Sequence, residues 1–324
     1  MLTSRPTSVE HVAVELWPQQ ARGGLGMAVG RLVEQLADAG ARSRVLMPSG
    51  SLAVGEHPTA WGTIVALPIA SRGAERIAAY SELAGAAHAP GSLLVCHDHE
   101  AAAAALLARH RHSDARIVVW LHSLYDTPHP SELPPALREL SRPDSLTAGA
   151  LEIADLIVTS AGILADAREL DWPPRMQATR AALLRAAERG QVCLVEADQC
   201  LPSTPSPIDA PASERPRLLF AARPGVHKGA GIFLAIVERL AALDVEFVAL
   251  GDPLAAGLDP RDPTVARVRW LPWLSPDQFY PLLRSSTCAL LPSLSEGFGL
   301  VAAEADALGV PLLYNDIGGL RSLP

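Results

Sequence analysis

Two acidic residues near the carboxyl end of the chain stand at a spacing that suits sugar binding. Glu296 precedes a Gly-Phe-Gly turn, and Glu304 follows eight residues later, inside a helix predicted to begin near Phe298. The backbone amides expected to point out of the helix start are those of Gly297, Phe298, Gly299 and Leu300. Because a carboxylate accepts paired hydrogen bonds from adjacent hydroxyls, the two acids are predicted to grip two parts of a sugar nucleotide. The alternative is that Glu296 caps the helix and Glu304 is solvated.

A pair of basic residues is predicted to hold a phosphate group. Arg223 follows an apolar strand pattern at Arg217–Ala222, and Lys228 stands five residues later, just before Gly229 and a helical pattern. Ligands of open α/β sheets bind at the carboxyl ends of the strands, and a helix N-terminus favours an anion. We therefore expect Arg223 and Lys228 to converge on one phosphate, the alternative being two separate solvated cations.

A glycine-rich turn near the amino end is the third candidate ligand contact. The segment "ARGGLGMAVGRL", residues 21–32, follows the first strand pattern and opens the first helical pattern. Gly24, Gly26 and Gly30 fit a loose dinucleotide-binding pattern, but that use needs an acidic residue at the end of the second strand. The second strand ends "VLMPSG" without one. The turn is therefore interpreted as a sugar-phosphate contact, with a purely structural turn as the alternative.

Histidines follow two strand patterns of the first half. His97 and His99 belong to the segment "CHDHE", and His122 ends the segment "VVWLH". The residue types suit a metal, but their alternation across a strand end and the lack of a helical ligand spacing argue against one. His122 is either a structural residue at a strand end or a contact to the donor sugar.

Apolar strand patterns that alternate with helical patterns predict an α/β fold. In the first half the strand patterns are His11–Trp17, Arg42–Pro48, Gly62–Pro68, Ser92–His97, Arg116–His122 and Ala154–Ser160, with a first helix at Leu25–Ala39. In the second half they are Arg217–Ala222, Glu246–Gly251, Ala266–Pro272, Thr287–Pro292 and Val310–Asn315. Such alternation is typical of parallel sheets covered on both faces. We predict two doubly wound, Rossmann-like domains, 1–200 and 217–324, joined by a Pro- and Ser-rich linker at 201–216 and facing across a cleft.

Composition narrows the class of protein. The chain has 324 residues and a net charge of −8, which gives no general attraction to nucleic acid. The amino-terminal segment lacks the pattern of a signal peptide, and no apolar stretch is long enough to span a membrane. The four scattered cysteines indicate free thiols in a reducing compartment. We therefore expect a cytoplasmic protein without a transmembrane segment. The sequence does not indicate the oligomeric state.

The motifs resemble those of a known family. "SEGFGLVAAEADALGVPLLYNDIGG" closely resembles the Glu-x7-Glu segment of retaining glycosyltransferases with the GT-B fold, and "AARPGVHKG" resembles their diphosphate site. In the first half "GGLGMAVGRL", "CHDHEAAAAALL" and "VVWLHSLYD" are similar to segments of bacterial glycogen and starch synthases. The resemblance implies the GT-B fold and transfer of a sugar from a nucleotide diphosphate sugar to a hydroxyl acceptor. It implies neither a metal nor a cofactor.

The resemblance also implies roles for single residues. Arg223 and Lys228 would neutralise the donor diphosphate, and Glu304 would hold the ribose hydroxyls. Glu296 and the amides after it would hold the transferred sugar. From the first domain, Gly23 and Gly24 would bring N–H groups to the diphosphate, His122 would lie near the reacting sugar, and Asp98 near the acceptor.

Departures from the glycogen and starch synthase pattern bear on the acceptor. This chain has Ala21-Arg22, Met27, Ser123 and Gly297-Phe298 where those synthases have other residues. α-Glucan synthesis is therefore not expected, and a small or soluble acceptor, such as a metabolite, lipid head group or natural product, is favoured. The chain ends at Pro324, so the second domain is expected to be incomplete. The alternatives are a non-catalytic or degenerate nucleotide-sugar-binding protein and, less favoured, an NAD(P)-dependent oxidoreductase.

Overall fold

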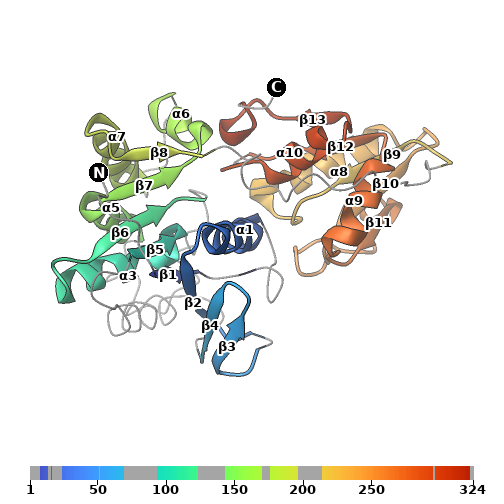
Figure 1. Cartoon of the computed structure of the whole chain (residues 1–324). Coiled ribbons are helices and arrows are strands. Elements are labelled where there is room, and N and C mark those ends of the chain that lie inside the picture. Colours follow the sequence, from blue (N-terminus) through green and yellow to red (C-terminus); the bar gives the residue numbers. More distant parts are fainter. Residues whose placement is uncertain are drawn as a thin grey trace. The chain divides into compact units, whose positions relative to one another are not determined.

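The chain forms two compact units, each with its own sheet and core (Figure 1). The computed structural model describes residues 8–13, 16, 24–50, 52–68, 93–122, 143–169, 176–195, 214–294 and 296–321. The units divide between Val195 and Glu196. The predicted linker, 201–216, is described only from residue 214 onward, so the linker and the domain limits stay a prediction.

The first unit is built on an eight-stranded sheet with the order β3-β4-β2-β1-β5-β6-β7-β8. Its strands are β1 (Ser8–Val12), β2 (Arg42–Pro48), β3 (Gly55–Thr59), β4 (Gly62–Leu67), β5 (Leu93–His97), β6 (Arg116–Trp120), β7 (Leu156–Thr159) and β8 (Val192–Leu194). Each predicted strand of this half is confirmed, although β1 begins at Ser8 where His11 was predicted. The order of strands reverses between β1 and β5, and such a switch point is where open α/β sheets bind ligands.

Two strands, β3 and β8, have no counterpart among the predicted patterns. β3 contains Pro58, which cannot donate a hydrogen bond to a neighbouring strand. It is tolerated because β3 lies at the edge of the sheet and pairs antiparallel with β4 across a short turn. β8 has three residues at the opposite edge, and Cys193 and Leu194 are exposed, so its sequence lacks the buried apolar run of a central strand.

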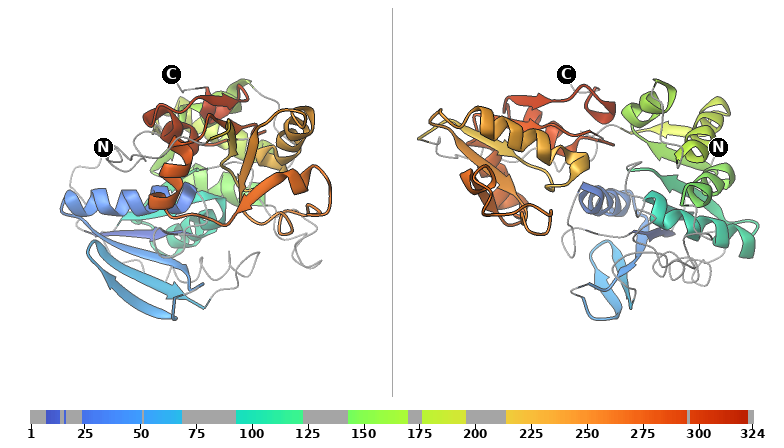
Figure 2. Two further views of the ribbon diagram at one scale, coloured as in Figure 1. Left: turned by 90° about the vertical axis from the view of Figure 1, so that its right-hand side faces the viewer. Right: turned by 180° about the vertical axis from the view of Figure 1, so that it is seen from behind.

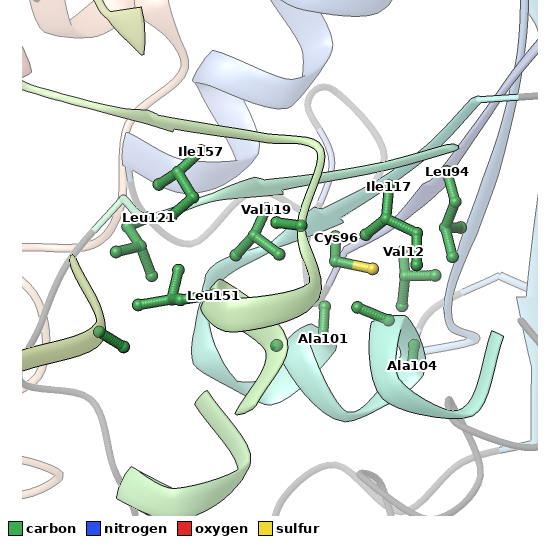
Figure 3. Close-up of a cluster of buried hydrophobic side chains, with 14 of the residues drawn as sticks. Val12, Leu94, Cys96, Ala101, Ala104, Ile117, Val119, Leu121, Leu151 and Ile157 are labelled. Carbon is green, nitrogen blue, oxygen red and sulfur yellow. The ribbon is translucent and has the colours of Figure 1, made fainter. Parts of the chain in front are cut away.

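Helices cover both faces of this sheet. α1 (Gly24–Asp38) packs on one face, where Val29 and Val33 meet Val45 and Met47. The other face is covered by α3 (Asp98–Arg111), α5 (Pro143–Ile153), α6 (Ala161–Glu169) and α7 (Gln177–Glu188). Figure 3 shows strand residues such as Cys96, Ile117 and Val119 facing the alanines of α3. The packing of helices on both faces thus fixes the positions of β1, β5 and β6, and with them the carboxyl ends of these strands.

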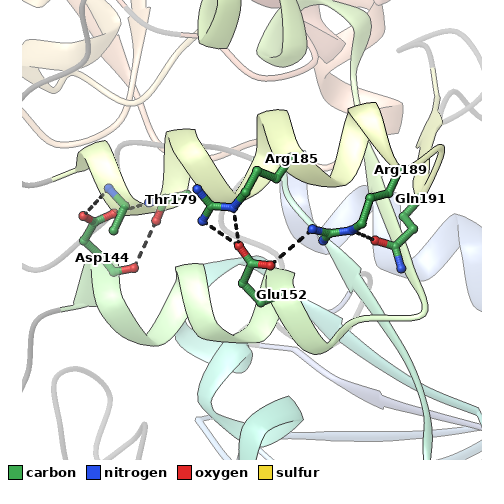
Figure 4. Close-up of polar contacts among 7 residues, drawn as sticks. Asp144, Glu152, Thr179, Arg185, Arg189 and Gln191 are labelled. Atoms are coloured by element: carbon green, nitrogen blue, oxygen red, sulfur yellow. Dashed lines mark hydrogen bonds and ion pairs between the residues drawn. The ribbon is translucent and has the colours of Figure 1, made fainter.

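An acidic residue of α5 caps the start of α7. The Asp144 carboxylate accepts hydrogen bonds from the amides of Ala178 (2.9 Å) and Thr179 (2.7 Å), in the first turn of α7 (Figure 4). Met176, the N-cap residue of α7, makes no side-chain hydrogen bond to these amides. Further along the same pair of helices, Glu152 of α5 accepts from Arg185 and Arg189 (Figure 4). These exposed ion pairs add little, so Asp144 is the stronger polar tie between the two helices.

Replacing Asp144 by Ala is expected to destabilise the first unit. The change leaves two helix-start amides without their acceptor, which costs about 1–2 kcal/mol. For a unit of this size that corresponds to a fall in Tm of about 3–6 °C. Thermal unfolding followed by circular dichroism measures the change. Glu188→Ala, at the exposed carboxyl end of α7, is the matched control, and a Tm equal to wild type in both variants would contradict the capping role.

The second unit is built on a five-stranded parallel sheet with the order β11-β10-β9-β12-β13. Its strands are β9 (Arg217–Phe220), β10 (Glu246–Leu250), β11 (Val268–Leu271), β12 (Cys288–Leu291) and β13 (Leu312–Tyr314). All five strand patterns of this half are confirmed. The order reverses between β9 and β12, which pair in parallel with Phe220 opposite Leu290, so the loops that follow these two strands leave the same edge at the switch point.

Besides η5 (Val265–Arg267), a 3-10 turn directly before β11, three helices and two short 3-10 turns complete the described part of the second unit. α8 (Ala230–Arg239) packs Phe233 and Val237 on one face of the sheet, and the right-hand view of Figure 2 shows it in front of the strands. α9 (Pro276–Arg284) packs Leu283 on the other face. α10 (Leu300–Ala307) follows β12, while η4 (Val226–Lys228) and η6 (Gly318–Leu320) are the short turns.

Candidate functional site

The switch point of the second unit brings together a lysine and a glutamate. The Lys228 ammonium ends η4, after β9, and lies 2.9 Å from a carboxylate oxygen of Glu296, after β12. The two side chains are 21% and 16% exposed, so both are shielded but reachable. The Ser293 hydroxyl donates to the same oxygen at 3.3 Å. Two residues that are 68 positions apart in the sequence thus form one polar group at the carboxyl ends of neighbouring strands.

Glycines make this convergence possible. Gly229, the N-cap of α8, has a φ of 76°, and a Cβ there would lie 1.8 Å from the Pro292 carbonyl oxygen. The turn after η4 is therefore in direct backbone contact with the end of β12. On the other side, the Gly319 amide donates to the Glu296 carbonyl at 3.1 Å, and a Cβ on Gly319 would lie 2.2 Å from the Gly297 carbonyl oxygen. The loop that carries Glu296 is held between these contacts.

The second glutamate of the motif has a different partner. Glu304 lies on α10, which begins at Leu300 after the left-handed N-cap Gly299, two residues later than predicted. Its carboxylate accepts a hydrogen bond of 3.2 Å from the Tyr280 hydroxyl of α9. Burial raises the pKa of Glu304 to about 7, and the Tyr280 hydrogen bond opposes that rise. Among the described residues, the Glu304 side chain forms no hydrogen bond or ion pair with Lys228 or Glu296.

The raised pKa of Glu304 predicts a pH dependence of stability. The folded carboxyl binds its proton more tightly than the unfolded one, so its contribution to stability is greatest below about pH 4.5 and is lost as the pH rises through about 7. The loss is on the order of 2–3 kcal/mol. We expect Glu304→Gln to raise Tm at pH 8 but to change it little at pH 5. Asp306→Asn, exposed on the same helix, is the control, and parallel curves for wild type and Glu304→Gln would refute the prediction.

The remaining predicted donor contacts of the second unit are placed as follows. Arg223 lies in the loop after β9 with an exposed side chain, and it makes no side-chain hydrogen bond or ion pair with another described residue. Phe298 is buried, 7% exposed, so its side chain belongs to the core and only its backbone is a candidate contact. Gly297 and Gly299 lie between Glu296 and α10, and Leu300 is the first residue of α10. The structure thus joins Lys228 and Glu296 directly, and among the described residues it shows no such contact for Arg223.

In the first unit, His122 lies at the end of a row of hydrogen-bonded imidazoles. His11 Nδ1 is 3.1 Å from His97 Nε2, and His97 Nδ1 is 3.0 Å from His122 Nε2. His11 and His97 are fully buried and His122 is 8% exposed. Trp120 stacks on His122, with ring centres 5.2 Å apart and planes 7° from parallel. By residue type the sequence offers His97, His99 and His122 as metal ligands, whereas His11 lies inside an apolar strand and carries no such signal.

Burial keeps these imidazoles uncharged. It lowers the pKa of His11 to about 3 and that of His122 to about 4, and it holds the pKa of His97 well below its usual range. The negative charge of Asp98 acts in the opposite direction on the pKa of His122. Among the described residues no group of three His, Cys, Asp or Glu side chains surrounds a point where a metal ion would fit.

Asp98 and the glycine turn are placed at the same edge of the first sheet. Asp98 is buried and begins α3 with a φ of 65°, a left-handed conformation that is uncommon for a residue other than glycine. Gly24 is the first residue of α1, the next described helix after β1. Gly23 lies outside the described residues.

The described helices contain none that is both long and apolar enough to cross a membrane.

Two sheets of this kind, each with polar residues at its switch point, are typical of the GT-B class of glycosyltransferase folds. The family model for a glycosyl transferase 4-like domain matches residues 23–182, and that for glycosyl transferases group 1 matches residues 215–323. The chain belongs to the GT-B-fold glycosyltransferases.

Solved structures agree on the fold. Sucrose-phosphate synthase from Thermosynechococcus elongatus aligns with a TM-score of 0.71 at 19% identity, over 98% of this chain and 83% of that one. The catalytic domain of starch synthase IV from Arabidopsis thaliana aligns with a TM-score of 0.68 at 18% identity, over 99% and 87%. At these identities the likeness concerns the fold alone.

Curated relatives match over shorter stretches. A D-inositol 3-phosphate glycosyltransferase from Rhodococcus erythropolis is 34% identical over 94 residues, 26% of this chain and 21% of that enzyme. One from Xylanimonas cellulosilytica is 32% identical over 155 residues, 40% of this chain and 35% of that enzyme. The matched stretches thus span about a fifth to a third of the length of these relatives.

Proposed function

We propose that this chain transfers a sugar from a nucleotide diphosphate sugar to a hydroxyl acceptor, with retention at the anomeric carbon and without a metal ion. The observation that supports this most is the Lys228–Glu296 pair at the switch point of the second unit. An ammonium group has three N–H donors, so Lys228 can bind a phosphate oxygen while it keeps its bond to Glu296. The adjacent carboxylate accepts from sugar hydroxyls, and the two groups together suit a sugar 1-phosphate.

The proposed step breaks the bond between the anomeric carbon and the diphosphate oxygen and forms a bond to the acceptor oxygen. Lys228, with Arg223 and the start of α8, stabilises the negative charge on the leaving nucleoside diphosphate. Glu296 and the amides of Gly297 and Phe298 hold the sugar, and Glu304 holds the ribose. The acceptor approaches from the face that the diphosphate leaves, and its proton passes to a diphosphate oxygen. Asp98 and His122 are assigned to the acceptor and the reacting sugar.

The relatives support a small acceptor. Several are named for D-inositol 3-phosphate, a polyol with a phosphate group. Among the solved structures, one holds ADP and acarbose and another UDP-2-fluoro glucose, which supports a nucleoside diphosphate sugar as the donor class. We therefore place a small polyol or sugar phosphate first among the acceptors.

Two measurements test the proposal. A thermal-shift screen with UDP-, ADP-, GDP- and TDP-sugars is expected to find one that raises Tm, because a ligand of the native state stabilises it. That donor is then incubated with D-inositol 3-phosphate and other small polyols, with EDTA present, and released nucleoside diphosphate and the anomeric proton of the product are followed by NMR. Binding without release for every acceptor would indicate a non-catalytic binding protein. An inverted product or a loss of rate in EDTA would overturn retention or metal independence.

A further inference from the structure

The three imidazoles of the first unit run along its switch point toward the ligand edge. His11 lies on β1 opposite Val95 of β5, and His97 lies two residues beyond Val95, opposite Trp120 of β6. His122 follows Trp120 by two residues. Each hydrogen bond therefore joins neighbouring strands diagonally, and each step moves two residues toward the carboxyl ends of the strands. The bond between His11 and His97 spans the point where the strand order reverses.

A row of neutral imidazoles has only two arrangements of its protons. A neutral ring carries one N–H, so each ring donates through one nitrogen and accepts through the other. In the first arrangement His11 Nδ1–H donates to His97, His97 Nδ1–H donates to His122 Nε2, and His122 carries its proton on Nδ1. In the second arrangement every bond is reversed, and His122 carries its proton on Nε2. The inner end of the row decides between them.

The inner end favours the first arrangement. His11 is fully buried, and its Nε2 has no hydrogen-bond partner in the part of the chain that the structure describes. The second arrangement would leave an N–H at this atom without an acceptor, whereas the first leaves only a lone pair without a donor. Among backbone groups a buried orphan N–H is the rarer of the two, and the same order is expected for a ring nitrogen.

The outer end fixes the direction of the donor. His122 Nε2 faces His97, so Nδ1 is the ring nitrogen that points away from the row. Trp120 fixes the plane of the ring by stacking on both His97 and His122, so the ring's direction as well as its proton is set.

We propose that His97, backed by His11, holds His122 as a neutral imidazole with its proton on Nδ1, so that the ring offers an N–H donor to an oxygen acceptor at the ligand edge. His97 and His11 are then positioning residues that act through His122. The acceptor oxygen that fits is a sugar hydroxyl, and this part of the proposal rests on the proposed function. The proton arrangement does not rest on it.

The arrangement is measured on the unliganded protein. Long-range proton–nitrogen NMR of protein labelled with ¹⁵N-histidine distinguishes protonated from bare ring nitrogens, and His122→Gln assigns the signals. At pH 7 we expect His122 with a protonated Nδ1 and a bare Nε2. The reverse pattern, or a charged ring, would overturn the proposal whether or not any sugar transfer is found.

Variants test the positioning role. His97→Phe keeps a ring beside Trp120 but removes the partner of His122 Nε2, so the His122 signals are expected to move toward a mixture of both proton positions. Once a donor and acceptor are known, turnover is expected to fall about fivefold to tenfold, the worth of one hydrogen bond, with a smaller change in KM for the donor. If His97→Phe does not fold, His97→Gln has the same expected outcome. His110→Phe, exposed on α3, is the control. Unchanged His122 signals in a folded His97 variant would overturn the role.

Discussion

Lys228→Ala is expected to lower turnover by about a thousandfold or more while the fold persists. In the proposed reaction negative charge grows on the departing diphosphate, and removing one preorganised donor to such a charge costs about 10²–10³ in rate. The loss is larger here because the variant also leaves the Glu296 carboxylate, 16% exposed, unpaired beside the phosphate, where it repels it. The rate of nucleoside diphosphate release measures the effect.

The unpaired Glu296 calls for a second variant. Removing one partner of a shielded ion pair destabilises by itself, so the Tm of Lys228→Ala/Glu296→Gln, which has no unpaired carboxylate, shows how much stability Lys228→Ala loses through Glu296. The double variant is expected to melt close to wild type. The single variant is expected to melt close to wild type or a few degrees lower. Arg269→Ala, at an exposed ion pair with Glu246 in the same unit, is the matched control. A Lys228→Ala rate within threefold of wild type would remove Lys228 from the mechanism.

Lys228 also offers a direct spectroscopic test, because it is the only lysine in the sequence. Reductive methylation with ¹³C-formaldehyde labels this side chain and the amino terminus. The Lys228 signal is expected to shift when the donor identified by thermal shift is added. A signal that is insensitive to saturating donor would place the phosphate elsewhere.

Strand positions follow from the sequence where a strand is buried on both faces. β9 and β12 contain continuous apolar runs, at residues 218–220 and 288–291, and the limits of both strands were predicted to within a few residues. β1 was predicted too late, because the apolar pattern continues beyond Val12 while the pairing with β5 ends there. β3 and β8 are edge strands, and the solvent on one side removes the pattern on which such a prediction depends.

The sequence predicts those parts of the site that depend only on the order and direction of the strands. Lys228 and Glu296 follow neighbouring parallel strands, so alternating strand and helix patterns suffice to place them at one edge. Tyr280 was missed because it lies on an amphipathic helix, where its spacing is that of a core residue. His11 was missed for the same reason in a strand. Such contacts depend on how a side chain packs in three dimensions, and no local pattern records that.

Gly229 follows Lys228 in the predicted phosphate motif, but backbone packing requires a glycine at this position. Gly229→Ala is therefore expected to be the most destabilising substitution considered. In the sequence Gly229 is only the residue between Lys228 and a helical pattern. In the structure it serves the fold, because its φ is 76° and an added Cβ would lie 1.8 Å from the carbonyl oxygen and 2.6 Å from the carbonyl carbon of Pro292. Backbone atoms cannot rotate away as a side chain does, so η4 and the end of β12 must separate. We expect a loss of more than about 4 kcal/mol.

Two other glycines separate the causes of this loss, which are the left-handed backbone conformation and the contact of the added Cβ with Pro292. Gly309 has a φ of 66° and open space around its Cβ position, so Gly309→Ala is expected to cost only the left-handed conformation, about 1–2 kcal/mol. Gly231, inside α8 with open space and no positive φ, is expected to gain up to about 1 kcal/mol as alanine. Urea midpoints of the three variants should therefore rank Gly231→Ala above wild type, then Gly309→Ala, then Gly229→Ala. If Gly229→Ala matched Gly309→Ala, the backbone would not be in contact at Pro292, and the convergence of Lys228 with Glu296 would lack the support that the structure gives it.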